Sequence, residues 1–268
     1  KRLYWSEEIP DKRWSLKTDG RIRFLEEGKI KKQTLKGSDN LHSPAFVPND
    51  SYLSASAYNT DGRTYVAIIE GVYGKTLKTL NPPDSLQIVE TAWIKDMLYA
   101  TAVTENGFGI YCTAVDLKSE KSSEWIEVLS PLPVKIKDFQ SHGHELMFTC
   151  DRTGVNELYH LNPAEGKIFQ KTNTHYGASD FAYSPDGEYL YLSAETLKGL
   201  QLCRIKTDSL LNRQVNFEDI HQYVLADALA QQEKELAILE GASEAVPVND
   251  SIRISKPKRY RKASHMFN

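Results

Sequence analysis

Hydrophobic and polar positions recur along this chain with a period of roughly 45 residues. The clearest unit is the segment 181–194, FAYSPDGEYLYLSA, in which apolar runs flank the turn SPDG. Pro185 sets the φ needed at the second position of a type I turn, and Gly187 can take the positive φ that closes a hairpin. We therefore predict two strands here. We expect the second, at 189–192, to be buried on both faces because its apolar run is unbroken.

Weaker copies of this unit fill the preceding residues. Each opens with an aromatic residue, and the aligned set is Phe46, Trp93, Phe139 and Tyr183. An apolar run and a polar, glycine-bearing turn follow. The predicted third strands are 64–69, 110–117, 157–161 and 200–205, and the predicted fourth strands are 76–80, 125–129 and 167–171. Four short strands per repeat are typical of a β-propeller blade.

The N-terminal segment fits the same template in a shifted phase. Residues 3–5 match the second strand, 21–25 the third and 29–35 the fourth, with an insertion at 7–20. The chain is therefore expected to start within a blade. We predict an all-β fold, a propeller of four-stranded blades of which about four to five are visible. They would form an incomplete arc of a larger ring or a ring with unusual closure.

Beyond residue 211 the pattern changes. Apolar residues recur at helical spacing over 216–239, and Asn216 is a suitable N-cap. The expected organisation is propeller blades at 1–211, an amphipathic helix packing on the propeller at 212–241, and a linker and basic tail at 242–268. A helix that binds a partner is the alternative. The tail is either a solvated segment or one attracted to anionic head groups.

Composition narrows the function classes. The chain has 268 residues, of which 40% are hydrophobic and 26% charged, and its formal net charge is -3. A nucleic-acid-binding domain is usually basic, so none is expected. No apolar run approaches the roughly 18 residues that span a bilayer as a helix. The three cysteines, Cys112, Cys150 and Cys203, lie in predicted strands and are expected to pack in the core.

Two segments carry a family resemblance. SPAFVPNDSYLSASAYNTDGR and DFAYSPDGEYLYLSAETLKG resemble the repeats of TolB-like propellers, relatives of WD-repeat blades. The resemblance covers about residues 1–210 and implies a binding scaffold in the periplasm or cell envelope. Related blades form the gating propeller of the prolyl oligopeptidase group. The segments RLYWSEEIPDKRW and KPKRYRKASHMFN are similar to stretches of exported Bacteroidetes-type proteins in which a propeller precedes an outer-membrane domain.

Catalytic and metal-binding signals are weak. A serine hydrolase of the α/β type needs a GxSxG elbow, and the sequence contains none. His142 and His144 lie two apart and could ligate a metal from one strand face, but a hairpin turn explains them equally well. Acidic turns such as 59–62 have turn chemistry rather than the ligand spacing of a calcium loop. We predict no enzyme activity, no metal and no cofactor.

Propeller geometry predicts where a ligand would bind. Loops that join second to third strands, and fourth strands to the next blade, share one face. The residues predicted to bind there are Trp14, Asn59, Arg63, Asn106, Phe108, Arg152 and Asn156. Aromatic, amide and guanidinium groups together suit a peptide or glycan. The alternative for each residue is an ordinary polar loop position.

The sequence thus favours a non-catalytic recognition or scaffolding propeller of an exported envelope protein. Its partners would be proteins, peptides or glycans, and sequence beyond this chain would associate it with the outer membrane. The second hypothesis is a substrate-gating propeller of a serine peptidase of the prolyl oligopeptidase type whose catalytic domain is absent from this chain.

Overall fold

The computed structural model describes residues 2–10, 18–37, 40–47, 51–58, 61–118, 124–221, 228 and 231–235. Its strands form five antiparallel sheets. Sheet 1 holds β1 (Arg2–Pro10), β2 (Thr18–Glu26) and β3 (Gln33–Thr34), and sheet 2 holds β4 (Leu41–Phe46), β5 (Tyr52–Tyr58), β6 (Thr64–Glu70) and β7 (Thr76–Leu80). Sheet 3 holds β8 (Gln87–Ile94), β9 (Met97–Thr104), β10 (Gly107–Ala114) and β11 (Ile126–Leu132).

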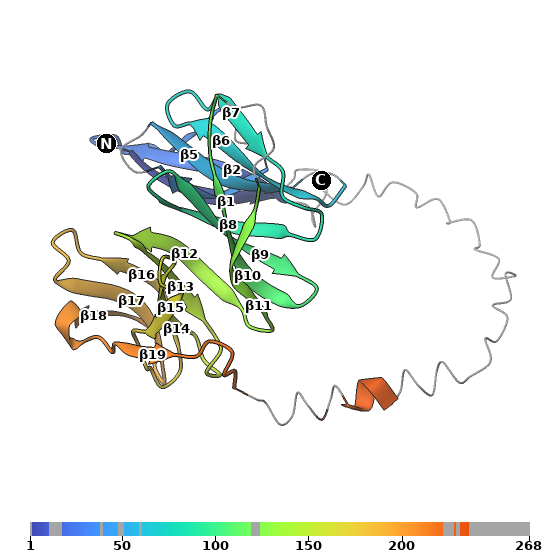
Figure 1. Cartoon of the computed structure of the whole chain (residues 1–268). Helices are drawn as coiled ribbons and strands as arrows, with labels where there is room; N and C mark the ends of the chain where they lie inside the picture. The colour runs from blue at the N-terminus through green and yellow to red at the C-terminus, as the bar shows by residue number, and fades with distance from the viewer. Residues whose placement is uncertain are drawn as a thin grey trace, which may run out of the picture. The chain divides into compact units, whose positions relative to one another are not determined.

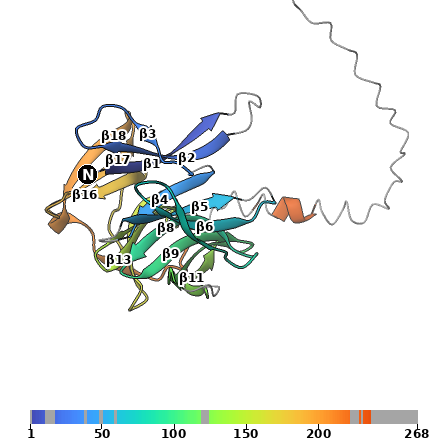
Figure 2. The same cartoon turned by 90° about the horizontal axis from the view of Figure 1, so that it is seen from above.

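Sheet 4 holds β12 (Ile136–His142), β13 (Glu145–Cys150), β14 (Glu157–Asn162), β15 (Lys167–Gln170) and β19 (Arg213–Val215). Sheet 5 holds β16 (Ala178–Tyr183), β17 (Tyr189–Thr196) and β18 (Gly199–Lys206), and a 3₁₀ turn, η1 (Thr207–Ser209), follows it. Figures 1 and 2 allow the sheets to be followed in sequence order from blue to orange. The molecule is an all-β, five-bladed propeller, which confirms the predicted fold class.

Four apolar clusters hold successive sheets together. Ile22 of sheet 1 packs with Leu53 of sheet 2, and the next cluster joins sheets 2 and 3. Phe148 belongs to the cluster between sheets 3 and 4, and Leu190 to the one between sheets 4 and 5. Within the described ranges, no core cluster joins sheet 5 back to sheet 1. Each inner sheet therefore buries two faces, whereas the terminal sheets bury one.

The burial of residues 189–192 differs from the prediction. Leu190 and Leu192 are buried, but Tyr191 between them is 37% exposed. Side chains along a strand alternate between two faces, and only one face of sheet 5 packs on a neighbouring described sheet. The unbroken apolar run was wrongly interpreted as burial on both sides.

The first hairpin is longer than predicted. Residues 7–10 and 18–20, assigned to an insertion, are paired strand: Glu7 lies opposite Arg21, and Pro10 opposite Thr18. The inserted residues continue the ladder because they alternate between the two faces without a glycine or proline turn before Pro10. Residues 11–17, which include Trp14, lie outside the described part of the chain.

The segment after β18 also departs from the prediction. A helix was expected to begin at Asn216, but β19 pairs with β15 and a turn follows it. Phe217 is 4% exposed and meets the rings of Phe148 and Tyr159 edge-on, with centroids 5.7 and 5.5 Å away. Burial of this ring outweighs the helical spacing that the sequence suggested.

The chain divides into two compact units, residues 1–221 and 222–268. In the second unit, the described residues 228 and 231–235 are helical. The rest of the predicted helix, the linker and the basic tail lie outside the described residues, and the packing of the helix on the propeller stays a prediction. No helix among the residues described has the length and apolar character needed to cross a bilayer. All three cysteines are free, and Cys112 and Cys150 are buried as expected.

Replacing Phe217 tests whether this segment belongs to the propeller. We expect Phe217→Ala to lower the free energy of unfolding by about 3–4 kcal/mol, because it empties a buried aromatic site. Urea denaturation measures the change. Leu200→Ala, at a side chain that is 64% exposed, is the control and should change it little. An equally small effect of Phe217→Ala would contradict the observed packing.

Candidate functional site

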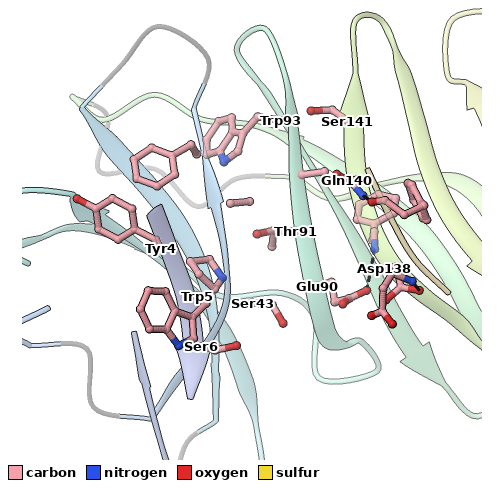
Figure 3. Close-up of a pocket in the computed structure, with 17 residues that line it drawn as sticks. Tyr4, Trp5, Ser6, Ser43, Glu90, Thr91, Trp93, Asp138, Gln140 and Ser141 are labelled. Carbon is pink, nitrogen blue, oxygen red and sulfur yellow. Dashed lines mark hydrogen bonds between the residues drawn. The ribbon is translucent and has the colours of Figure 1, made fainter. Parts of the chain in front are cut away.

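A pocket of about 490 Å³ lies where the five sheets converge. One edge strand of each sheet lines it: β1, β4, β8, β12 and β16. This is the arrangement that a propeller gives its central channel. Figure 3 shows Trp5, Glu90 and Asp138 among the lining side chains, reaching the opening from different strands. The pocket is our candidate binding site.

Bulges aim several of these side chains at the pocket. The pairing of each of β4, β8, β12 and β16 with its neighbour is interrupted once, near Ser43, Glu90, Asp138 and Asp180. Ser43, Asp138 and Asp180 have φ values of 48°, 54° and 49°, in the left-handed region. Asp tolerates this region better than most residues, and a bulge commonly re-aims a side chain at a functional site. The same local device therefore recurs in successive blades.

Two of the carboxylates at these bulges also join neighbouring sheets. The backbone N–H of Phe139 donates to Glu90 Oε2 at 3.1 Å, and that of Asp180 donates to Asp138 Oδ2 at 3.4 Å. The Thr149 hydroxyl donates to Asp138 Oδ2 at 2.8 Å. Each carboxylate thus binds the bulge of the next sheet. These contacts fix the positions of the acids before any ligand arrives.

Aromatic side chains form much of the remaining wall. Trp93 is 2% exposed, and its indole N–H donates to Ser54 Oγ at 2.8 Å. Ser54 Oγ is in turn 2.7 Å from Thr91 Oγ1. In Figure 3, Trp5 lies across the opening from Glu90. A hydrogen-bonded indole is held rigidly, so this wall is preorganised for an apolar or cationic group.

The described lining of the pocket is acidic. It includes Glu90, Asp138 and Asp180 but no Lys, Arg or His. Burial is the main cause that raises the pKa of Glu90, the Phe139 N–H lowers it, Asp138 raises it and Lys137 lowers it, and the resulting pKa is about 7. Glu90 is therefore partly protonated near neutral pH. A cation entering the pocket would favour its charged form.

The structure places the predicted loop residues in three separate blades. Arg63, in the β5–β6 loop, lies 3.3 Å from Asp84 of the β7–β8 connection, and both loops line a second pocket of about 440 Å³. Asn106 lies in the β9–β10 turn, and the backbone carbonyl of Asn156 accepts a hydrogen bond from the Ala178 N–H. Second-to-third loops therefore do meet the connections between blades, but these residues do not converge on one pocket.

Two of the predicted binding residues make contacts within the fold. Phe108 lies within β10 rather than in a loop, and it packs against the cluster between sheets 3 and 4. Arg152 is 5% exposed; its Nη2 donates to the carbonyl oxygens of Asn216, at 2.8 Å, and Asp219. Trp14 and Asn59 lie outside the described residues. A binding role for the seven residues stays a prediction.

The sequence did not lead us to predict the pocket residues, although their spacing from the aligned aromatic residues is regular. Ser43, Glu90 and Asp180 each precede an aligned aromatic residue by three positions. In three blades the aligned aromatic residue lies opposite the first leucine of the second strand; these residues are Phe46, Trp93 and Tyr183. In the fourth blade Ser141 holds this position, whereas the sequence alignment predicted Phe139. Because of this two-residue error, Asp138 was not recognised as the equivalent of Ser43, Glu90 and Asp180.

The histidine pair lies at the predicted hairpin turn between β12 and β13. The His142 ring stacks on Tyr183 with centroids 4.3 Å apart. His160 instead occupies the interface of sheets 4 and 5, where its Nδ1 is 2.7 Å from Glu145 Oε2 and its Nε2 3.2 Å from the Tyr183 hydroxyl. Among the described residues, no group of three or more His, Cys, Asp or Glu side chains is arranged to hold a metal.

Comparisons with known proteins agree on the fold. No protein-family model and no curated protein matches this sequence. Among solved structures, the chain is similar to TolB from Acinetobacter baumannii, with 15% identity and a TM-score of 0.57 over 80% of this chain and 52% of that one. A TolB protein from Agrobacterium tumefaciens gives 11% identity and a TM-score of 0.56 over 80% of each chain.

The chain is also similar to a peptidase of known structure. Prolyl oligopeptidase B from Galerina marginata shares 8% identity, with a TM-score of 0.51 over 82% of this chain and 34% of the peptidase. The chain thus spans about half the length of the Acinetobacter TolB and about a third of the oligopeptidase. At these identities the likeness shows a TolB-like propeller fold and nothing more.

Glu90 gives a stability test of this site. Its folded-state pKa of about 7 exceeds the ordinary value of 4.5. Between these values the folded state binds more protons than the unfolded state, so this group's contribution to stability falls as pH rises from about 4.5 to 7. We expect Glu90→Gln to raise the free energy of unfolding at pH 8 by about 1–3 kcal/mol and to change it little at pH 4.5.

Urea denaturation at the two pH values measures this difference. Asp96→Asn, in the exposed β8–β9 turn, is the matched control that removes a carboxylate elsewhere. A gain from Glu90→Gln that is the same at both pH values would show that Glu90 is not the group that titrates.

Proposed function

We propose that this propeller is a non-catalytic recognition domain whose central pocket binds a positively charged group of a peptide or protein. The observation that carries the proposal is the pocket itself, with three carboxylates, aromatic walls and no described cation in its lining. Carboxylates offer charge-assisted hydrogen bonds to guanidinium and ammonium groups. Trp5 and the other rings offer cation–π contact to the same groups.

Preorganisation supports this role. Glu90 and Asp138 are already held by backbone N–H groups of the next sheet, so binding would cost little side-chain ordering. The bulges hold the carboxylates on sheet edges rather than on long loops. Such a site selects for charge and shape and needs no chemical step.

We also propose that the protein is exported to the periplasm or cell envelope. The TolB-like sequence repeats carry this expectation, and the likeness to two TolB structures supports the fold on which it depends. Fold likeness alone is an associational argument for location. Fractionating the source cells and probing each fraction with an antibody against this chain tests it; a band confined to the cytoplasm would contradict it.

The gating hypothesis rests on a different comparison. A propeller of this fold occurs in prolyl oligopeptidase B, of which this chain covers about a third. Gating would need a catalytic domain in the same protein, and this sequence has no GxSxG elbow. The acidic pocket favours recognition, because a gate that admits varied peptides has no need for one charge preference.

Binding of an arginine peptide tests the recognition function. The probe is a short, end-capped fluorescent peptide with one arginine, and its counterpart carries citrulline, a neutral isostere. We expect the arginine peptide to bind more tightly. Asp138→Asn should weaken its binding about tenfold, because it removes the charge while Asn still tolerates the left-handed backbone. Fluorescence anisotropy measures both affinities.

The same assay has a pH signature. Glu90 gains charge as pH rises through about 7, so arginine affinity should increase from pH 6 to pH 8. Citrulline affinity should stay constant, and Glu90→Gln should abolish the increase. Asp96→Asn serves as the control again. Equal binding of the two peptides, or full binding by Asp138→Asn, would refute a cation-binding pocket.

A further inference from the structure

The outer edge of sheet 5 differs from the outer edges of the other sheets. Sheets 2 and 3 end in a fourth strand, sheet 4 gains β19 beyond its fourth, and sheet 1 ends in the two-residue strand β3. Sheet 5 ends at its third strand, β18, which lies at the margin of the sheet in Figure 1. After η1 the chain crosses to sheet 4 as β19, so in the described part of the chain no strand pairs with the outer edge of β18.

Other outer edges are blunted in recognised ways. β3 has two residues and β19 three, too short to template a partner. β7 has five residues and a register shift, and β11 contains Pro131 and two shifts. Natural proteins use short strands, prolines and bulges to prevent edge pairing. β18 has none of these three, since its eight residues pair with β17 without interruption; of the recognised devices it carries only charged side chains, Arg204 and Lys206.

The open face beside this edge carries exposed apolar side chains. Leu200 and Leu202 of β18 are 64% and 78% exposed, and Leu197 in the preceding turn is 89% exposed. Leu202 lies across from Ser193 on β17, and Tyr191 continues the same exposed surface. Exposed apolar side chains next to unpaired backbone groups favour the addition of a strand.

Charge selects the occupant. Residues 197–206 carry Lys198, Arg204 and Lys206 and no acid. Arg204 and Lys206 share the exposed face with the two leucines, because they follow at alternate positions. A second copy of β18 would bring two basic strands together. A strand that carries acids opposite these residues would be attracted instead.

We propose that the outer edge of β18 binds an extended strand of a partner protein, with acidic residues opposite Arg204 and Lys206 and apolar residues opposite Leu200 and Leu202. The added strand becomes the fourth strand of blade 5. Backbone hydrogen bonds contribute affinity, and the alternate side chains contribute specificity. This site lies apart from the central pocket, so either proposal can fail without the other.

An antiparallel peptide is the test ligand. Its sequence, Glu-Val-Glu-Val-Val-Thr-Val-Thr, places glutamates opposite Lys206 and Arg204 and valines opposite Leu202 and Leu200. One control peptide carries lysine in place of glutamate. A second has alternate backbone nitrogens methylated, which removes the donors that a strand needs. Fluorescence anisotropy with the full chain measures the affinities, and amide hydrogen exchange reports protection within β18.

We expect the glutamate peptide to bind, both control peptides to bind at least about tenfold more weakly, and exchange to slow in β18. Leu202→Glu should also weaken binding about tenfold or more, by removing an apolar contact and adding repulsion. Leu77→Glu, the same change at an exposed leucine of edge strand β7, is the matched control and should leave binding intact. Thermal melting establishes that both variants are folded.

Three outcomes would overturn the proposal. The glutamate peptide does not bind, or it binds without protecting β18, or Leu202→Glu leaves its affinity unchanged. Sedimentation of the chain alone tests whether a second copy of the chain, rather than a partner strand, occupies the edge. A dimer that Leu202→Glu dissociates and Leu77→Glu does not would show that a second copy takes the edge.

Discussion

Face-to-face packing of neighbouring sheets is the constraint on which this propeller depends. Each sheet is thin and twisted, and it becomes stable only when its apolar faces meet those of its neighbours. Four clusters satisfy this condition between successive sheets. The polar contacts of Glu90 and Asp138 then fix how each bulge meets the next one. The pocket is a product of this stacking, because its walls are the edges that the stacked sheets bring together.

The repeat made the fold predictable. Strong local signals, such as the SPDG turn and the runs after it, specify hairpins, and hairpins repeated at constant spacing specify blades. β7 was predicted at its observed bounds, and most other strands within a few residues. Periodicity failed at residues 216–221, where helical spacing gave way to burial of Phe217 directly after the pairing of β19. A tertiary contact decided the local structure there, and periodicity does not encode such a contact.

The candidate site was harder to predict because bulges interrupt side-chain alternation and because the spacing between blades varies. A bulge adds one residue to a strand, so alternation along the sequence no longer tells which side chains face the pocket. Phe139 was aligned with Phe46 on spacing, yet Ser141 holds the equivalent position. The loop residues were chosen from polar composition, which is common to many loops. Arg152 has a suitable chemical type, but its donors are directed to the backbone of residues 216 and 219.

The anchoring of residues 213–221 also determines how the propeller would respond to mechanical force. Tension on the chain beyond His221 reaches sheet 4 first, through the backbone bond of His221 to Arg152, the buried ring of Phe217 and the short ladder of β19. The tension does not pass through sheet 5, although sheet 5 precedes this segment in sequence. Under load, the β19 ladder would detach before any blade is pulled apart, because only three of its residues pair with β15.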